Sequence, residues 1–382
     1  MIASEFGIPA AACRKIRAPA RRQNRRNRVP RPPPRPGAFV VHGRPRMKQR
    51  LLAAGAVAWL GWKLLQKSRE ASLDGSVVVI TGGSRGLGLL LAREFGRHGC
   101  RVAVCARDEA ELDAARADFA RRGIDALTFR CDVSDRADVE IFIDRVIERF
   151  GGLDILVNNA GISQVGPLNT MRIEDFERAM AINFWGAVYA TYAVLPYMRR
   201  RGRGRIVNIT SIGGKVAIPH LLPYDCAKFA LVAFSEGAAT ELAADGIAVT
   251  TIVPGLMRTG SASNALFKGS QQREFDWFSL GSATPLTAIS AERAARRIVA
   301  ATRRGEAVVT LSWQANLLRT FHGALPSASV RILSGVNRLL PQADPEKTAE
   351  ARGVQFRRPA LTAMMDHAAR RTHQFVGAGA RH

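Results

Sequence analysis

Cysteine is scarce in this sequence, and its placement excludes several kinds of site. The 382 residues include five cysteines, an odd count, with no Cys-x-x-Cys pair and no Cys/His cluster at the spacing of metal ligands. This pattern argues against a zinc ribbon, a redox dithiol and a disulfide-stapled scaffold. We therefore expect reduced thiols that pack as small apolar side chains, and no metal site.

The sequence also lacks an apolar run long enough for an ordinary transmembrane helix. The apolar segment at residues 51–65 contains Lys63 and has basic flanks, whereas spanning a bilayer takes roughly 20 residues. Trp59 and Trp62 suit a membrane interface. We predict an anchor or interfacial helix within residues 47–70. A secretory signal and a helix packed on protein are the alternatives.

Acidic residues are few, with 32 Asp and Glu against 56 Lys and Arg, and the basic excess lies at the two ends. Residues 1–50 hold 14 Lys and Arg against Glu5, and residues 291–382 hold 15 against six acids, which leaves the centre nearly neutral. Basic ends bind anionic surfaces, but no aromatic interleaving or nucleic-acid motif accompanies this charge. We expect a membrane surface as partner and no specific nucleic acid.

The N-terminal extension, residues 1–46, is rich in Arg and Pro and shows no apolar period. Such a segment buries too little surface to offset the entropy of ordering, so we expect disorder. Met47 then opens a basic flank followed by the apolar segment. Our hypothesis is that translation begins there and that residues 1–46 are absent from the native protein.

Short β-branched runs alternate with helical stretches from residue 76 to about residue 310. Strands are predicted at 76–81, 101–106, 126–130, 153–157, 205–210, 247–253 and 307–310, and helices at 86–98, 109–122, 135–149, 173–200, 223–244 and 290–303. Strands separated by helices imply a doubly wound parallel sheet of the α/β, Rossmann-like class. We therefore predict one main domain over residues 71–310.

Beyond residue 310 the alternation stops. Residues 311–340 place apolar side chains between Arg319, Arg331 and Arg338, which is an amphipathic pattern. This extension could lie on a membrane, cover a substrate pocket or pair with another subunit, and the sequence does not choose. Residues 341–382 are expected to form a weakly ordered basic tail.

A glycine-rich turn, TGGSRGLG from Thr81 to Gly88, follows the first strand. Such a turn lets backbone N–H groups approach a pyrophosphate at a helix N-terminus. The second strand ends at Ala106 and Arg107, where an acidic residue would suit the ribose hydroxyls of NAD(H). Arg107, with Arg85 of the turn, suits a 2′-phosphate instead. NADP(H) is the expected cofactor and NAD(H) the less favoured one.

Two further motifs follow predicted strands. Asp132 and Val133 come after the third strand, and Asn159, Ala160 and Gly161 come after the fourth. In a parallel sheet these are carboxyl ends, where ligands bind. Asp132 is suited to accept from an adenine amine, and the small Ala-Gly pair lets a nucleotide pass close.

Tyr224 and Lys228 lie four residues apart on a predicted helix, 13 residues after Ser211 at the end of the fifth strand. Their spacing brings the ammonium and the phenol to one helix face. A phenol has a pKa near 10, and a neighbouring cation favours its anion. Ser211 is placed to hold a substrate oxygen near Tyr224.

Together these motifs resemble the short-chain dehydrogenase/reductase family, in its single-domain branch with a TGxxxGxG turn. The resemblance covers residues 76 to about 310. It implies that Tyr224 is the proton donor and acceptor, that Lys228 binds the nicotinamide ribose and lowers the tyrosine pKa, and that Ser211 orients substrate. It also implies that Asn183 positions a water in a proton relay. Pro254, Gly255 and Thr259 would meet the nicotinamide side.

The predicted catalytic set is therefore Asn183, Ser211, Tyr224 and Lys228. The predicted cofactor-binding residues are Gly82, Ser84, Arg85, Gly86, Leu87, Gly88, Arg107, Asp132, Val133, Asn159, Ala160, Gly161, Tyr224, Lys228, Pro254, Gly255 and Thr259. We expect hydride transfer between NADP(H) and an alcohol or carbonyl substrate, apolar because residues 256–289 are rich in aromatics. We expect the catalytic domain to face the cytoplasm, and a homo-oligomer is a further expectation. A nucleotide-sugar epimerase or dehydratase, or a non-catalytic NADP-binding scaffold or redox sensor, are the alternatives.

Overall fold

The computed structural model describes residues 70–283, 288–343, 346–356 and 370–374. The predicted disordered extension and apolar anchor, residues 1–46 and 51–65, lie outside the described residues. Within the described ranges, no helix combines the length and the apolar character needed to cross a membrane.

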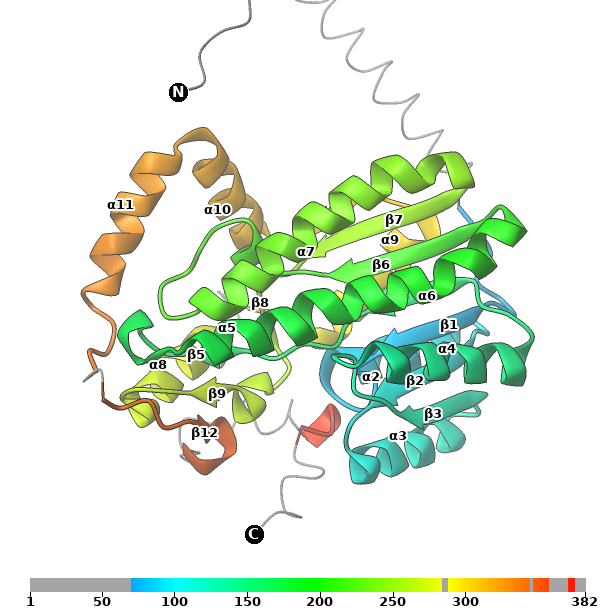
Figure 1. Ribbon diagram of the computed structural model, residues 1–382, viewed down its shortest axis with the longest axis horizontal. Coiled ribbons are helices and arrows are strands. Elements are labelled where there is room, and N and C mark those ends of the chain that lie inside the picture. Colours follow the sequence, from blue (N-terminus) through cyan, green and yellow to red (C-terminus); the bar gives the residue numbers. More distant parts are fainter. Residues whose placement is uncertain (1–69, 284–287, 344–345, 357–369, 375–382) are drawn as a thin grey trace, which may run out of the picture. The chain divides into compact units, whose positions relative to one another are not determined.

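Seven parallel strands form the central sheet, in the spatial order β11-β7-β6-β4-β1-β2-β3 (Figure 1). The order reverses direction between β1 and β4, which is the switch point of a doubly wound sheet. The predicted fold class is thus confirmed. The strands are β1 Val77–Thr81, β2 Arg101–Ala106, β3 Ala126–Arg130, β4 Ile155–Asn158, β6 Gly204–Ile209, β7 Ile247–Val253 and β11 Val308–Thr310.

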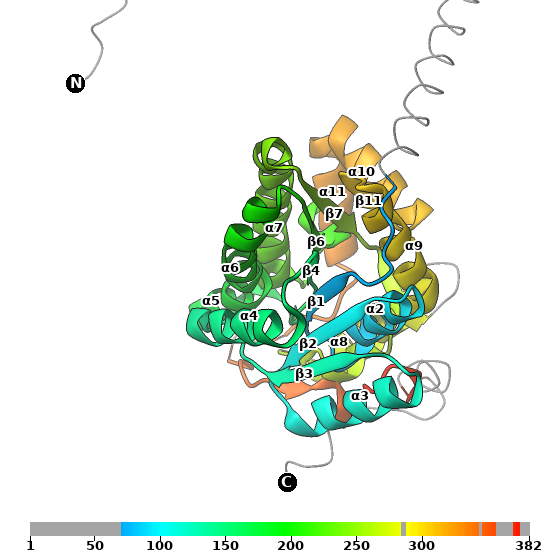
Figure 2. The same cartoon turned by 90° about the vertical axis from the view of Figure 1, so that its right-hand side faces the viewer.

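Helices cover both faces of this sheet, as the edge-on view shows (Figure 2). One face carries α2 Gly86–Arg97, α3 Glu109–Arg121 and α9 Ala291–Arg304, and the other carries α4 Arg136–Phe150, α5 Ile173–Met180, α6 Gly186–Arg201 and α7 Leu222–Glu241. All five residues of β1 are buried, as its position in the middle of a doubly covered sheet requires. The two cores meet at this strand, because Val78 and Ile80 face one while Val77 and Val79 face the other.

The predicted helix at 173–200 is interrupted in its middle. Residues Ala181–Trp185 form a π-helical turn between α5 and α6. A π turn adds one residue to the helix and is frequent at functional sites. The sequence pattern is helical on both sides, so apolar periodicity alone does not reveal this interruption.

Several small elements beyond the main sheet are absent from the predicted set. A three-stranded sheet joins β5 Gln164–Val165, β9 Leu266–Phe267 and β12 Ala351–Arg352, and a two-stranded sheet joins β8 Leu256–Arg258 and β10 Ala288–Ser290. Helix α8, Gln271–Ala283, packs beside them. Thus part of the predicted basic tail pairs with a strand that precedes it by some 85 residues.

The amphipathic extension forms two helices, α10 Trp313–Ala324 and α11 Pro326–Asn337. They pack against one another and form a hairpin beside the sheet (Figure 1). Large apolar side chains on the hairpin stay exposed, among them Trp313, Leu317 and Ile332.

Candidate active site

The loops that follow β1, β2, β3, β4, β6 and β7 meet at one edge of the sheet. Because all seven strands are parallel, their carboxyl ends share that edge. The motifs singled out in the sequence therefore come together, although they are spread over some 180 residues of the chain.

The glycine turn packs tightly against the loop after β4. Gly82 has φ +66°, and a Cβ on it would lie 2.9 Å from the Cα of Ala160. A Cβ on Gly88 would lie 2.2 Å from the carbonyl oxygen of Gly82. Such distances leave no room for a side chain, so both positions require glycine.

Thr81 and Asn159 fasten these two loops together. The Thr81 hydroxyl accepts from the backbone N–H of Asn159 and of Ala160, each at 3.1 Å. The Asn159 amide donates to the carbonyl oxygens of Thr81, at 3.0 Å, and Gly82, at 2.9 Å. The Asn159 side chain thus holds the glycine turn in its shape.

Arg85 is engaged within the protein. It donates to Glu111 Oε1 at 2.6 Å and to Asn264 Oδ1 at 2.9 Å, while Ser84 donates to Glu111 Oε2 at 2.8 Å. Burial lowers the pKa of Arg85, as do the neighbouring charges of Arg352 and Arg107, whereas Glu111 acts to raise it. The guanidinium groups of Arg85, Arg107 and Arg352 therefore lie near the turn, together with the buried carboxylate of Glu111.

At the ends of β2 and β3, Arg107 Nη1 lies 3.8 Å from Asp132 Oδ2, and both side chains are exposed. Asp132 also accepts from the backbone and hydroxyl of Ser134 through its other oxygen. Val133 is buried against the core. The side chain of Arg107 is the more accessible of the two predicted phosphate-binding arginines.

Ser211, Tyr224 and Lys228 are brought together as the spacing predicted. Ser211 follows β6 and its hydroxyl accepts from the N–H of Gly213 at 3.0 Å. Tyr224 lies in the first turn of α7, and Lys228 Nζ lies 5.7 Å from the centroid of its ring. Lys228 is buried and donates to the Ile209 carbonyl oxygen at 2.9 Å.

The pKa values of this pair move in opposite directions. Burial raises the pKa of Tyr224 to about 12; a hydrogen bond with Ser211 acts to lower it, and the nearby Asp225 acts to raise it. Burial lowers the pKa of Lys228 to about 8. Desolvation therefore dominates the pKa of both side chains.

Asn183 lies in the π turn and is almost fully buried. Its amide donates to the carbonyl oxygens of Ile162 and Ala179, both at 3.1 Å, and its oxygen accepts from the Ile162 N–H at 3.2 Å. A Cβ on Gly161 would lie 2.6 Å from Asn183 Oδ1 and 3.7 Å from Lys228 Nζ. Asn183 and Lys228 therefore flank one backbone position.

The loop after β7 completes this edge. The carbonyl oxygen of Pro254 accepts from the N–H of Ile212 at 2.7 Å, which ties the loop to the segment after Ser211. A Cβ on Gly255 would lie 2.7 Å from Ser312 Oγ. Thr259 is buried, and its hydroxyl accepts from the N–H of Ser261.

Comparison with known proteins agrees with this architecture. A family model described as short chain dehydrogenase matches residues 76–267. The chain belongs to the short-chain dehydrogenase family. This membership confirms the resemblance predicted from the motifs. It also identifies the chain as an oxidoreductase.

Three proteins illustrate what this short-chain dehydrogenase is similar to. A "Dehydrogenase/reductase SDR family protein 7-like" of Anopheles gambiae is 39% identical over 240 residues, covering 60% of this chain and 76% of that protein. A solved short-chain dehydrogenase from Streptomyces avermitilis has 29% identity and a TM-score of 0.60, covering 69% and 98%. A gluconate 5-dehydrogenase from Burkholderia cenocepacia, solved with NADP and tartrate, has 28% identity and a TM-score of 0.54, covering 62% and 93%.

Several residues beside this dehydrogenase's site were not found by sequence reasoning. Glu111 and Arg352 adjoin Arg85, and Thr372 hydrogen-bonds to the glycine turn. Glu274 forms a buried pair at 2.9 Å with His220, which lies in the loop between Ser211 and Tyr224. Each depends on a contact between distant parts of the chain, for which the sequence carries no local signal.

Proposed function

We propose that this protein transfers a hydride between NADP(H) and an alcohol or carbonyl compound, with Tyr224 as the proton donor or acceptor. The observation that carries the proposal is the convergence of Ser211, Tyr224 and Lys228 at the carboxyl edge of the sheet. This edge is also where the glycine turn offers the N-terminus of α2 to a pyrophosphate.

The residues divide the chemistry among them. The bound nicotinamide supplies or accepts the hydride. The Tyr224 phenol, neutral at physiological pH because burial raises its pKa to about 12, donates a proton to the developing alkoxide. Ser211 orients the substrate oxygen through its hydroxyl. Lys228 adds positive charge next to the phenol. Asn183 fixes the backbone of Ile162 through two hydrogen bonds.

NADP(H) is favoured over NAD(H) by the charges at the adenosine end. Arg107 is exposed at the end of β2, and Arg85 and Arg352 lie close enough for their charges to interact. Guanidinium groups bind phosphates through paired charge-assisted hydrogen bonds. The Burkholderia gluconate dehydrogenase, a related fold, was solved with NADP. Glu111 opposes this preference, so Arg107 is proposed to carry most of it.

An apolar substrate is proposed from the walls around Tyr224. The loop between Ser211 and Tyr224 leaves Ile218, Leu221 and Leu222 half-buried. Phe267 and Phe275 pack fully inside a neighbouring aromatic cluster, to which Leu221 also belongs. The half-buried apolar side chains of this loop favour a hydrophobic ketone or secondary alcohol over a sugar.

Replacement of Tyr224 by Phe tests the reaction. We expect kcat for carbonyl reduction with NADPH to fall about 10²- to 10⁴-fold, the contribution of a positioned acid or base. Purified enzyme would be assayed against a carbonyl library by the loss of nicotinamide absorbance. Tyr192→Phe is the matched control, because Tyr192 is exposed on α6 and should keep full turnover. Full turnover by Tyr224→Phe would refute the assigned role.

Cofactor preference is tested with Arg107→Ala. The variant should raise KM for NADPH about tenfold or more and leave KM for NADH nearly unchanged, since only the former carries the 2′-phosphate. Arg116→Ala serves as control, because Arg116 is an exposed arginine on α3 that pairs with Asp113. Equal effects on both cofactors would contradict the assignment.

A further inference from the structure

A short C-terminal segment, Arg370–Gln374, lies against the glycine turn. The N–H of Gly86 donates to the Thr372 carbonyl oxygen at 2.8 Å, and the Thr372 hydroxyl donates to the Thr259 carbonyl oxygen at 2.8 Å. Thr372 is only 1% exposed. The segment thus bridges the turn after β1 and the loop after β7, the two loops to which the sequence assigns the cofactor.

Gln374 extends this contact toward the adenosine end. Asn264 donates to the backbone oxygen of Gln374 at 2.9 Å and to its side-chain oxygen at 2.8 Å. The Gln374 Nε2 lies 2.8 Å from the position that a Cβ on Gly86 would occupy. Asn264 is also the residue that accepts from Arg85. Arg85, one of the two predicted phosphate-binding arginines, is therefore linked to the segment through the Asn264 side chain.

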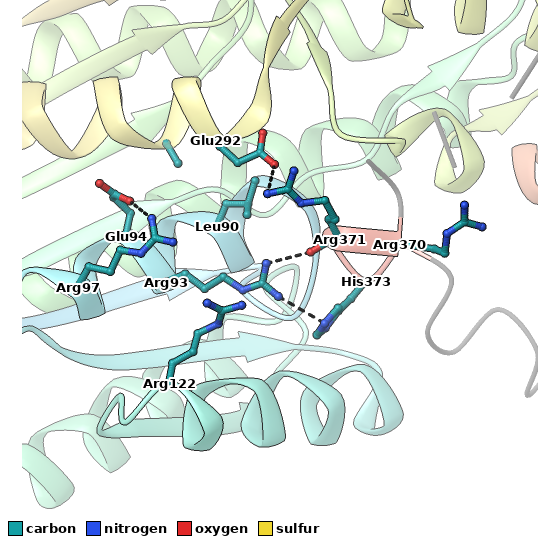
Figure 3. Close-up of a pocket in the computed structure, with 10 residues that line it drawn as sticks. Leu90, Arg93, Glu94, Arg97, Arg122, Glu292, Arg370, Arg371 and His373 are labelled. Carbon is teal, nitrogen blue, oxygen red and sulfur yellow. Dashed lines mark hydrogen bonds and ion pairs between the residues drawn. The ribbon is translucent and has the colours of Figure 1, made fainter. Parts of the chain in front are cut away.

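The opposite side of the segment is anchored on α2 and α9 (Figure 3). Arg93 donates to the Arg371 carbonyl oxygen at 2.9 Å, and Arg371 pairs with Glu292 at 3.3 Å. His373, whose Nε2 lies 3.5 Å from Arg93 Nη2, has φ +56°. A left-handed backbone is uncommon for a residue with a Cβ, and the contacts of Arg93 and Glu292 stabilise the segment in this conformation.

The hydrogen bond at Gly86 matters most for function. Gly86 begins α2, and the first N–H groups of a helix have no partner within the helix and form the anion site of a dinucleotide fold. Here one of these donors is satisfied by a peptide carbonyl. A pyrophosphate oxygen and the Thr372 carbonyl oxygen cannot both accept from this N–H at full strength, because they would occupy the same space.

We propose that Arg370–Gln374 is an autoinhibitory strap that occupies the pyrophosphate position and must leave before NADP(H) binds. The inference rests on the proposed function, because it presumes that NADP(H) is the ligand of this turn. The strap is held by neutral hydrogen bonds at the turn, whereas the cofactor brings two phosphate charges to the same helix end. NADP(H) therefore binds only the molecules in which the strap is open, and the apparent affinity is the intrinsic affinity multiplied by that open fraction.

The first test compares NADPH binding by the full chain and by a chain that ends at residue 369. Removal of the strap should lower the Kd for NADPH about tenfold or more, measured by calorimetry. A chain that ends at residue 376 keeps the strap and should bind as the full chain does. An unchanged or higher Kd for the chain ending at 369, with unfolding curves like those of the full chain, would overturn the proposal.

The second test uses the intact chain, so it holds even if truncation impairs folding. Arg370 and Arg371 are trypsin sites within the strap. Addition of NADPH should speed cleavage after these two residues, followed by mass spectrometry of the released C-terminal peptide. Slower or unchanged cleavage at saturating NADPH would show that the segment stays closed over the cofactor and would refute the strap. No NADPH binding by either chain in calorimetry would instead refute the proposed function, and the strap with it.

Discussion

Asp225, the neighbour of Tyr224 on α7, should make the stability of the protein strongly dependent on pH. Its side chain is 1% exposed, and its Oδ2 accepts from the N–H of Ile218 at 2.6 Å. Among the described residues Oδ1 has no hydrogen-bond partner. Burial raises the pKa of this carboxyl to about 8, with the Ile218 hydrogen bond opposing. The folded protein therefore retains a proton on Asp225 at neutral pH.

The sign and size of the effect follow from proton linkage. An unfolded aspartate has a pKa near 3.9, so between about pH 4 and pH 8 the folded state binds one proton more than the unfolded state. Stability from this group is complete below the unfolded pKa and is lost as the pH rises through the folded pKa. The free energy of unfolding should fall by about 1.4 kcal/mol per pH unit, or about 3 kcal/mol between pH 5 and pH 7.

Asp225→Asn removes the titrating proton and keeps an oxygen that accepts from Ile218. Urea unfolding of both proteins at pH 5, 6 and 7 measures the effect. The free energy of unfolding of the variant, relative to the unmodified protein, should improve by about 3 kcal/mol over this range. Asp113→Asn is the control, since Asp113 lies on the surface in an exposed pair with Arg116. Parallel stability curves for Asp225→Asn and the unmodified protein would refute the argument.

Three other substitutions test the packing of the site. Gly82→Ala should unfold more readily than Gly123→Ala, since both glycines have φ +66° but only Gly82 has a backbone atom within 3 Å of the new Cβ. Thermal unfolding measures the difference, and an equal loss of Tm in the two variants would contradict the close contact. Lys268→Met breaks a buried ion pair with Asp175 at 2.5 Å. The free energy of unfolding in urea should fall by about 3–5 kcal/mol, and an unchanged value would show that the ion pair does not stabilise the fold. Asn183→Ala removes three hydrogen bonds to Ile162 and Ala179 and should cost about 2 kcal/mol; a loss under 0.5 kcal/mol would show that water replaces them.

The main sheet could be predicted because its strands carry their own signals. The run at β1 is apolar at every position and ends at a glycine turn, which matches a buried central strand. The smaller sheets could not be predicted in this way, because strands of two or three residues contain no period. Strand β12 pairs with β9 across some 85 residues. Only tertiary packing defines such elements.

The same distinction explains what could be predicted of the site. Ser211, Tyr224 and Asn159 lie at strand ends or in the first turn of a helix, and parallel topology alone brings them to one edge. The π turn at Asn183 depends on bonds to Ile162, 21 residues earlier, so the sequence AMAINFWGA reads as ordinary helix. Glu111 binds Arg85 from a different helix. A charge pattern along the chain does not reveal that Arg85, predicted to bind a phosphate, already has a carboxylate partner.

Burial of Tyr224 and Lys228 also bears on the direction of the proposed reaction. With a pKa of about 12 for Tyr224 and about 8 for Lys228, the lysine loses its proton before the tyrosine does. A neutral phenol is the form that donates a proton during carbonyl reduction, so the raised pKa of Tyr224 suits that direction of the proposed reaction. Alcohol oxidation needs the phenolate, which costs about 1.4 kcal/mol for each unit between the pH and the tyrosine pKa. Positive charge brought next to Tyr224 reduces this cost. An oxidised nicotinamide bound beside Tyr224 would supply such a charge, whereas a reduced nicotinamide would not.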